Sequence, residues 1–171
     1  MEINYQTIAL ALGVVGTVLG IINSYWAITA NRVRLSVKPY PVLKRQGNIH
    51  VLPRNGSELK DSLNRSEEPK EILVQVINTG RATAWITGLG FIDKAKNERF
   101  NLVTPDLETN GRFPLNPNEQ KNIPTKMTPQ LRKYLRAGVD AAFAEAAGGR
   151  VFVGSTEVWG NYLQWLVAEE T

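Results

Sequence analysis

The feature that most constrains this chain is an uncharged apolar stretch close to its N-terminus. No charged side chain occurs from Ile3 to Asn31, and residues 8–28 are dominated by Ile, Leu, Val, Ala and Gly. As a helix with a rise of about 1.5 Å per residue, residues 8–28 would be roughly 30 Å long, which matches the hydrocarbon core of a bilayer. The sequence therefore predicts one transmembrane helix within residues 1–31, followed by a body of residues 32–171.

Two other interpretations of this stretch fit less well. A cleaved signal peptide needs basic residues before a shorter apolar segment, whereas this chain begins MEINYQ without Lys or Arg. A helix buried in a globular core rarely remains apolar on every side over such a length. Aromatic residues at both ends, Tyr5, Tyr25 and Trp26, are typical of a membrane interface.

A basic segment follows the apolar stretch and predicts its orientation. It contains no acidic residue, and its cations are Arg32, Arg34, Lys38, Lys44 and Arg45. By the positive-inside rule, the N-terminus lies outside the cell membrane and the body lies in the cytoplasm. Arg32, Arg34 and Lys38 are candidates for contact with lipid headgroups, although these cations can equally serve as topology signals alone.

Small residues recur along the apolar stretch at spacings of three and four, which places them on one face of a helix. They are Ala9, Gly13, Gly16, Gly20 and Ser24. Such a face lets a second helix approach closely, and Gly16 and Gly20 form a G-x-x-x-G pair. The pattern indicates a homo-oligomer packed through this helix, with a monomeric anchor as the alternative.

The body shows the pattern of a mainly β protein. Short runs rich in β-branched residues are separated by turn residues, with Asn78–Gly80 joining the two central runs and Gly80 expected at positive φ. One helix is predicted to begin at Thr128–Pro129 and to end before Gly148, with Arg132, Lys133 and Arg136 on a solvated face. The predicted strands are 33–37, which ends at Pro39 and Pro41, and 49–52, 72–77, 82–92, 100–103, 150–155 and 161–167.

The predicted fold class is mainly β. The transmembrane helix is followed by an immunoglobulin-like antiparallel β-sandwich with one inserted helix. Residues 54–70, with equal numbers of acidic and basic side chains and two leucines, form a surface loop or a short helix capped at Ser57.

The run VQVINTGRATAWITGLGF, residues 74–91, resembles the strand, N-x-G turn and strand element of immunoglobulin-like bacterial modules. The arrangement of anchor, basic flank, V-x-L-x-V strand, this element, helix and V-F-V hairpin is similar to that of small bacterial and phage single-pass membrane proteins. The resemblance covers most of the chain. It implies an architecture and a membrane placement, and no activity.

The residue types speak against an enzyme. The chain has no cysteine and one histidine, His50, so thiol nucleophiles and Cys-ligated metals are excluded. The adjacent carboxylates Glu67 and Glu68, and Glu169 and Glu170, lie in polar sequence. We therefore predict no catalytic residue, cofactor or metal, and the mild charge of 20 basic against 16 acidic residues indicates no nucleic-acid partner.

Two functions remain. The first is a membrane-anchored, non-enzymatic scaffold in contact with the lipid bilayer, which binds an unknown protein partner through a sheet face, a sheet edge or the 54–70 loop. The alternative is a prophage-type superinfection-exclusion or defence factor whose helix acts on a membrane protein.

Overall fold

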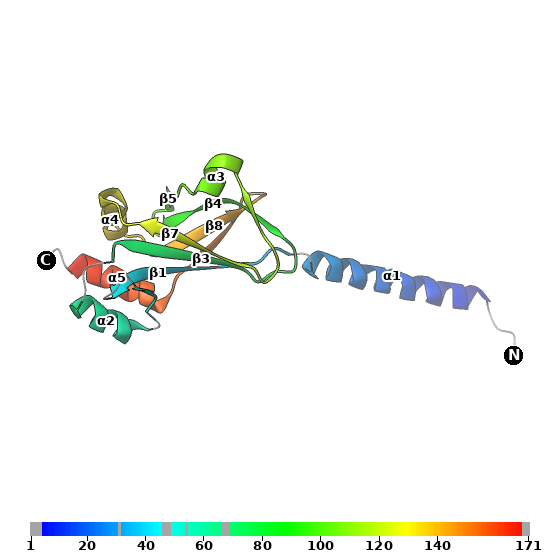
Figure 1. The fold of residues 1–171 in the computed structure, drawn as a ribbon. Coiled ribbons are helices and arrows are strands. Elements are labelled where there is room, and N and C mark those ends of the chain that lie inside the picture. Colours follow the sequence, from blue (N-terminus) through cyan, green and yellow to red (C-terminus); the bar gives the residue numbers. More distant parts are fainter. Residues whose placement is uncertain (1–4, 31, 46–48, 54, 66–68, 169–171) are drawn as a thin grey trace.

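The computed structural model describes residues 5–30, 32–45, 49–53, 55–65 and 69–168 of the chain. A long helix, α1 (Tyr5–Ala30), projects from a β-rich body, and the N-terminal end of α1 and the C-terminal end of α5 (Glu157–Ala168) lie at opposite ends of the molecule (Figure 1). The body follows from Arg32 onward and contains the remaining helices and all the described strands.

The strands form two antiparallel sheets. The first has the order β2-β1-β3-β7 and is built from β1 (Leu35–Arg45), β2 (Ile49–Val51), β3 (Glu71–Asn78) and β7 (Gln120–Lys126). The second has the order β5-β4-β8-β9, with β6 also paired to β4, and is built from β4 (Ala84–Asp93), β5 (Glu98–Asn101), β6 (Phe113–Leu115), β8 (Ala141–Ala146) and β9 (Arg150–Gly154).

One hydrophobic core is shared by both sheets. Strand β3 alternates buried and half-buried residues, and its inward side chains Ile72, Val74 and Val76 are fully buried. They belong to the same apolar cluster as Ile86 and Phe91 of β4. The period-2 pattern that predicted this strand therefore places one of its faces against the core.

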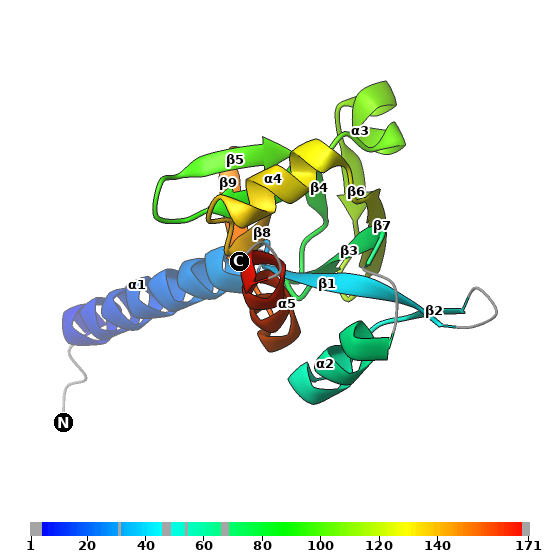
Figure 2. The ribbon, with the colours of Figure 1, turned by 90° about the vertical axis from the view of Figure 1, so that its left-hand side faces the viewer.

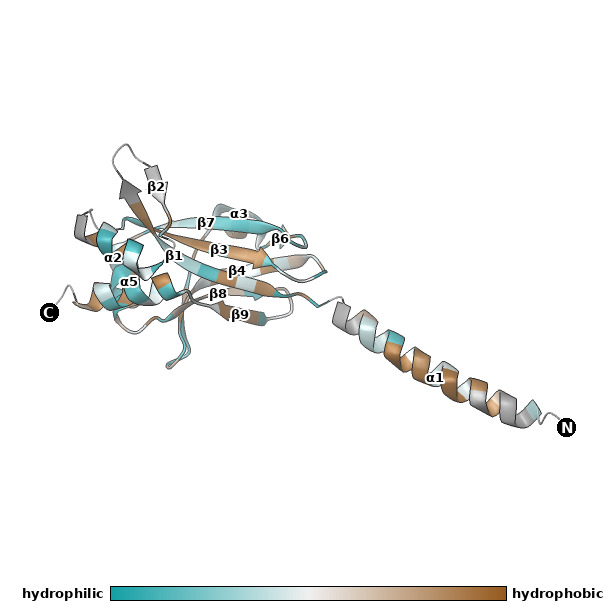
Figure 3. Ribbon diagram, turned by 90° about the horizontal axis from the view of Figure 1, so that it is seen from below, coloured by the Kyte–Doolittle hydropathy of each residue, from teal (hydrophilic) through white to brown (hydrophobic). Residues whose placement is uncertain are grey.

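Four further helices pack around the sheets: α2 (Gly56–Arg65), α3 (Pro105–Asn110), α4 (Pro129–Arg136) and α5 (Glu157–Ala168). Helices α2 and α5 lie side by side at the end of the body farthest from α1 (Figures 1 and 3). Figure 2 shows α4 on the side of the body near β5, with the C-terminal end of α5 close to it. The prediction of a single inserted helix is therefore wrong, because the described part of the body contains four helices.

Among the described residues, no helix is at once long enough and apolar enough to cross a membrane. This finding contradicts the transmembrane helix predicted in residues 1–31, the single-pass membrane character of the protein, and its predicted place in the inner membrane with a cytoplasmic body.

The turn at Asn78–Gly80 forms as predicted, but the reason for its glycine differs. Gly80 is absent from the residues with positive φ, so the expected left-handed conformation is wrong. A Cβ at Gly80 would instead lie 2.5 Å from the carbonyl oxygen of Arg32 and 2.7 Å from the backbone nitrogen of Arg34. Glycine is needed here because the segment before β1 passes directly over the turn.

The prediction that the first strand ends at its prolines is also wrong. Strand β1 continues through Pro39 and Pro41, which pair with Val74 and Ile72 of β3. On its other side, β2 pairs only with the last residues of β1, from Leu43 onward. The prolines therefore lie where β1 has a single hydrogen-bonded neighbour, a position at which a missing N–H is tolerated.

Two predicted elements near the C-terminus have a different structure. The helix that was predicted to continue to the stop at Gly148 ends at Arg136. Gly138, with φ of 125°, turns the chain into β8. The predicted strand 161–167 lies within α5 instead. The short elements α3, β6 and β7 were not predicted from the sequence.

Candidate functional site

Figure 3 shows brown, apolar positions along much of α1, interrupted by paler positions and by a teal, polar one near the body. Leu10, Leu12, Leu19, Ile21 and Trp26 are each at least 60% exposed. Large apolar side chains gathered on one exposed element usually mark a surface that another molecule covers. The helix is therefore the first candidate for an interaction surface.

The predicted small residues lie on this helix with space above them. A Cβ placed on Gly13, Gly16 or Gly20 would meet no atom within 4 Å beyond the backbone of the helix itself. Ala9 and Ser24 are also exposed, and at 100° per residue all five positions fall on one face. No described segment of the chain packs on this face, and its role in helix packing stays a prediction.

The basic residues after α1 are arranged around the backbone of the turn at 78–80. Arg32 and Arg34 have exposed side chains, and Lys38 is half-buried on β1. The carbonyl oxygen of Arg34 accepts hydrogen bonds from the backbone N–H groups of Thr79, at 2.8 Å, and Gly80, at 3.2 Å. This segment therefore fixes the start of β1 on the body, and a contact of its side chains with headgroups stays untested.

A second candidate site is a basic pocket beside α4. The helix begins as predicted, with the Thr128 hydroxyl accepting a hydrogen bond from the backbone N–H of Leu131 at 3.1 Å. Leu131 and Leu135, four residues apart, are buried in the core. The residue that follows each of these leucines lies at the edge of the buried face and is half-buried. Both of these residues are arginines, Arg132 and Arg136.

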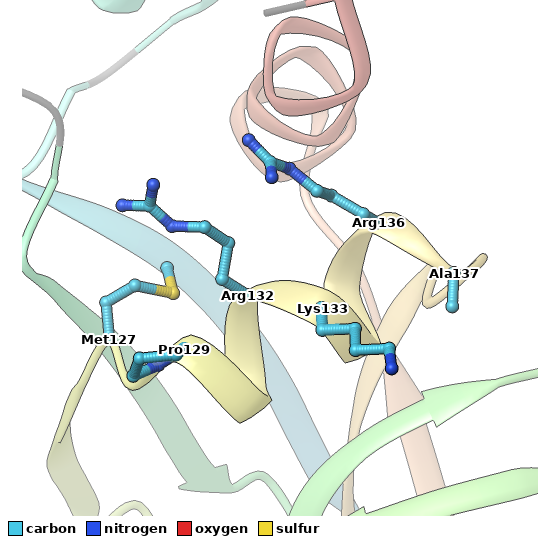
Figure 4. A pocket seen from close by; sticks show the side chains of 6 residues that line it. All are labelled: Met127, Pro129, Arg132, Lys133, Arg136 and Ala137. Atoms are coloured by element: carbon cyan, nitrogen blue, oxygen red, sulfur yellow. The ribbon is translucent and has the colours of Figure 1, made fainter. Parts of the chain in front are cut away.

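The basic pocket has a volume of about 630 Å³ and is lined by Met127, Pro129, Arg132, Lys133, Arg136 and Ala137. Figure 4 shows Arg132 and Arg136 extending to the same side of α4, with Arg136 reaching toward α5, while Lys133 extends away from them. The Nε–H of Arg136 donates a hydrogen bond to the carbonyl oxygen of Leu166 at 3.3 Å. A cation at the C-terminal end of α5 is favourable because the helix dipole is negative there.

Sequence reasoning located the three cations of the basic pocket but treated them as a solvated face. The described lining of the pocket comes from α4 and the residues next to it, and α5 lies beside α4, where its Leu166 carbonyl oxygen accepts from Arg136. The signal that was available is the i, i+4 spacing of Arg132 and Arg136, which directs two guanidinium groups to one side of a helix. Among the described residues, the lining of this pocket includes three cations and no acidic side chain.

The third candidate site is a cavity of about 560 Å³ between α2 and α5. The apolar part of its lining includes Leu59, Leu63 and Trp165, and polar side chains surround them. The sequence offered residues 54–70 as a partner-binding loop; the described part of that segment is α2, which forms one wall of this groove. Its helix is capped by Asn55, whose Oδ1 accepts from the backbone N–H of Glu58 at 2.9 Å, and not by Ser57 as predicted.

The described residues contain no group of three or more His, Asp or Glu side chains that could hold a metal ion. The side chain of His50 lies outside the described residues, as do Glu67, Glu68, Glu169 and Glu170. Among the described residues, one carboxylate is buried, that of Asp93 at the end of β4. Its Oδ1 accepts hydrogen bonds from the backbone N–H groups of Ala95, at 2.9 Å, and Lys96, at 3.1 Å.

These contacts make Asp93 a source of acid sensitivity. The backbone N–H of Lys96 lowers the pKa of Asp93 below its ordinary value, and the Lys96 ammonium, 3.3 Å away, lowers it further. Burial of the carboxyl opposes this and raises the pKa, but its effect is the smaller one. A carboxyl with a lower pKa in the folded than in the unfolded chain stabilises the fold above the unfolded value. That stabilisation is lost as the pH falls through the folded pKa.

We therefore expect Asp93→Asn to reduce the difference between the melting temperatures of the chain at pH 7 and at pH 3. The variant should be less stable than wild type at pH 7 and closer to it at pH 3. Thermal melts followed by circular dichroism measure this, with Glu108→Gln as a control that removes one exposed carboxylate. An equal acid-induced loss in Asp93→Asn and wild type would contradict the assigned pKa direction.

Comparison with known proteins adds little to this picture. No family model matches the chain, and no curated protein matches it. Among solved structures, the X-ray structure of Northeast Structural Genomics Consortium target SoR45 has 12% sequence identity and a TM-score of 0.28. That similarity covers 72% of this chain and 81% of the other, and it is too weak to bear on fold or function.

Proposed function

We propose that this protein is a non-catalytic interaction protein that assembles with further copies of itself through α1. One observation carries the proposal, namely the concentration of exposed large apolar side chains on that helix. They are Tyr5, Leu10, Leu12, Val14, Val15, Val18, Leu19, Ile21, Ile22, Tyr25 and Trp26. Among its described residues, the body exposes five such side chains that are far apart in the sequence, Leu52, Trp85, Val103, Val153 and Val167, and scattered exposure of this kind is normal for a folded protein.

The chemistry of α1 favours a partner of the same kind. The helix has no charged side chain, so it offers nothing to a partner that is recognised by ion pairs. Its glycine face lets the backbone of a second helix approach closely, and its remaining surface is apolar as well. Large apolar side chains lie around the helix outside the glycine face, so a single partner helix would leave most of them uncovered, which favours a bundle of several copies over a simple pair.

The body leaves room for such an assembly. In the view of Figure 1, α1 extends away from the sheets, so further copies can pack around it without meeting the body. The non-catalytic part of the proposal rests on the sequence, which has no cysteine and a single histidine. The β-rich body is then the part of each copy that is presented by the bundle.

The experiment is sedimentation velocity of the full chain in detergent-free buffer over a range of concentrations. We expect oligomers in wild type. Gly16→Leu combined with Gly20→Leu should raise the concentration needed for assembly by about tenfold, because two leucines keep the backbones apart.

The matched control is Val18→Leu combined with Ile22→Leu. These two positions have the same spacing, receive the same residue and lie on the opposite side of α1 from Gly16 and Gly20 at 100° per residue. Equal effects of the two double variants would contradict packing through the glycine face. A wild-type chain that stays monomeric at all concentrations would overturn self-assembly. The same conclusion would follow if the chain floated with lipid vesicles while it remained monomeric.

A further inference from the structure

Strand β9 (Arg150–Gly154) is an edge of the second sheet, and it is separate from α1 and from the assembly proposed above. It pairs with β8 in antiparallel register, with Ala146 opposite Arg150 and Ala142 opposite Gly154. Among the described residues, no strand pairs with its other side. We propose that this edge binds an extended segment of a partner protein as an added antiparallel strand, a common form of peptide recognition.

The register of the sheet decides which backbone groups of β9 are available. The backbone N–H of Ala147, directly after β8, donates to the carbonyl oxygen of Trp85 at 2.7 Å, so the odd-numbered residues of β8 bond toward β4. Its even-numbered residues then bond toward β9, where the residues opposite them are even-numbered as well. The N–H and C=O groups of Val151 and Val153 therefore point away from β8, to a side where no described strand pairs with them.

The described edge strands differ in how well they discourage pairing. Strands β2 and β6 are only three residues long, β5 carries Glu98 and Arg99, and β7 carries Pro124 and Lys126. Short length, charge and proline are the means by which natural sheet edges avoid an added strand. Strand β9 has none of these after Arg150, since its other residues are Val-Phe-Val-Gly, which favour a strand.

The side chains along this edge suit a partner with apolar residues at alternate positions. Val153 is 43% exposed, and Val151 packs against a small apolar cluster formed by Ile92, Ala141 and Phe143. Residues directly opposite each other on neighbouring strands point to the same face of a sheet and contact each other. We therefore expect β-branched residues opposite Val151 and Val153, where they would extend this cluster.

Arg150 indicates the charge of the partner. Its side chain is exposed, its Cζ lies 4.9 Å from the centroid of the Phe152 ring, and no described carboxylate forms an ion pair with it. An antiparallel partner brings its C-terminal end to Arg150, so an acidic residue there would fix the direction and register of binding. A second copy of β9, with the sequence RVFVG, has no acidic residue to offer, which favours a different protein over self-pairing.

The test is fluorescence anisotropy of a labelled eight-residue peptide titrated with the full chain. The peptide alternates valine and threonine, ends in glutamate and has both termini blocked. With the glutamate opposite Arg150, its last two valines lie opposite Val151 and Val153, so their N–H groups point to β9. We expect a dissociation constant on the order of 0.1 mM.

N-methylated peptides distinguish strand addition from other modes of binding. N-methylation of the valines removes the N–H groups that bond to β9 and should abolish binding. N-methylation of the threonines places the methyl groups on the side away from β9 and should change the dissociation constant by less than about threefold. These peptides leave the protein unchanged, so the comparison does not depend on the folding of a variant.

Val153→Pro removes one outward N–H from the edge and no bond to β8, so it should weaken peptide binding by at least about tenfold. Asn101→Pro is the matched control on β5, the opposite edge of the same sheet. The backbone N–H of Leu102 bonds to Leu89 of β4, so the N–H of Asn101 points outward too, and its loss should leave peptide binding unchanged. Thermal melts report whether both variants are folded.

Arg150→Glu tests the charge of the partner. This variant should bind a peptide that ends in lysine about tenfold more tightly than the peptide that ends in glutamate, the reverse of the wild-type preference. An unchanged preference for glutamate in the folded variant would contradict the role of Arg150. The double variant Gly16→Leu with Gly20→Leu leaves β9 intact and should bind the peptide as wild type does, so a failure of assembly through α1 is measured separately.

Four results would overturn strand addition by a partner segment. They are no binding of the peptide by wild type up to about 2 mM, equal binding of the two N-methylated peptides, unchanged binding in folded Val153→Pro, and an equal loss in folded Asn101→Pro. Sedimentation velocity identifies the competing occupant. If wild type does not bind the peptide and Val153→Pro lowers its oligomeric state, then β9 pairs with a second copy of this chain.

Discussion

Asn78→Ala is expected to lower the free energy of unfolding by about 3–5 kcal/mol, because three hydrogen bonds, two buried and one partly buried, lose one partner. The Nδ2 group of Asn78 donates to the carbonyl oxygens of Ala82 and Leu115, each at 2.8 Å, and Oδ1 accepts from the backbone N–H of Gly80 at 2.9 Å. The side chain is fully buried, so water does not replace these bonds without entering the core. Denaturant unfolding followed by tryptophan fluorescence measures the change.

Two further variants sharpen this prediction. Asn78→Asp keeps the shape of the side chain but puts a carboxylate against two carbonyl oxygens, so it should cost at least as much as Asn78→Ala. Asn122→Ala is the control: this asparagine is exposed on β7, and its Oδ1 accepts hydrogen bonds from the side-chain amides of Gln75, at 3.3 Å, and Gln120, at 3.1 Å. We expect a change within about 0.5 kcal/mol there. A loss below about 1 kcal/mol in Asn78→Ala would show that the turn is not held by this network.

Trp159→Ala is expected to cost about 3–5 kcal/mol of stability, since the removal of a large core side chain leaves a cavity. Trp159 is fully buried on α5, and its ring stacks on Phe91 of β4 with centroids 5.5 Å apart and lies 5.7 Å from the ring of Tyr162. It therefore joins the last helix to the centre of the second sheet. Denaturant unfolding of the full chain measures this loss as well.

Trp85 provides the matched control for Trp159. The same atoms are removed in Trp85→Ala, but Trp85 is 42% exposed and its main partner is the guanidinium of Arg112, 4.8 Å above the ring. We expect a loss of about 1 kcal/mol there. Trp159→Phe should cost less than Trp159→Ala, because a ring can still stack on Phe91 and the indole N–H has no hydrogen-bond partner among the described residues. Equal losses in Trp159→Ala and Trp85→Ala would contradict the placement of α5 in the core.

The candidate sites differ in how far the sequence could predict them. The apolar helix and its glycine face follow from residue spacing alone, because a helix places positions three and four apart on one side. The basic pocket does not, since it needs α4 to end at Arg136 and α5 to return beside it. Three cations on one helix look like a solvated face until the neighbouring element is known.

The sequence by itself determined the elements whose signals lie within a few residues. The β-branched runs around Asn78–Gly80 predict β3 and β4, and Thr128–Pro129 predicts the start of α4, because turn and cap residues bond to their own neighbours. A span of the membrane was also predicted from a local pattern, and the described residues do not bear it out.

Only the tertiary structure decided those elements whose hydrophobic pattern fits the period of a helix as well as the period of a strand. Residues 161–167 alternate well enough for a strand, yet Tyr162 and Leu166 lie one helical turn apart and are both buried. Residues 141–146 are mostly alanine, a strong helix former, yet they form β8 because β4 and β9 bind its two edges. In both cases the deciding partner is distant in the sequence, so the local pattern could not determine which structure buries the same side chains.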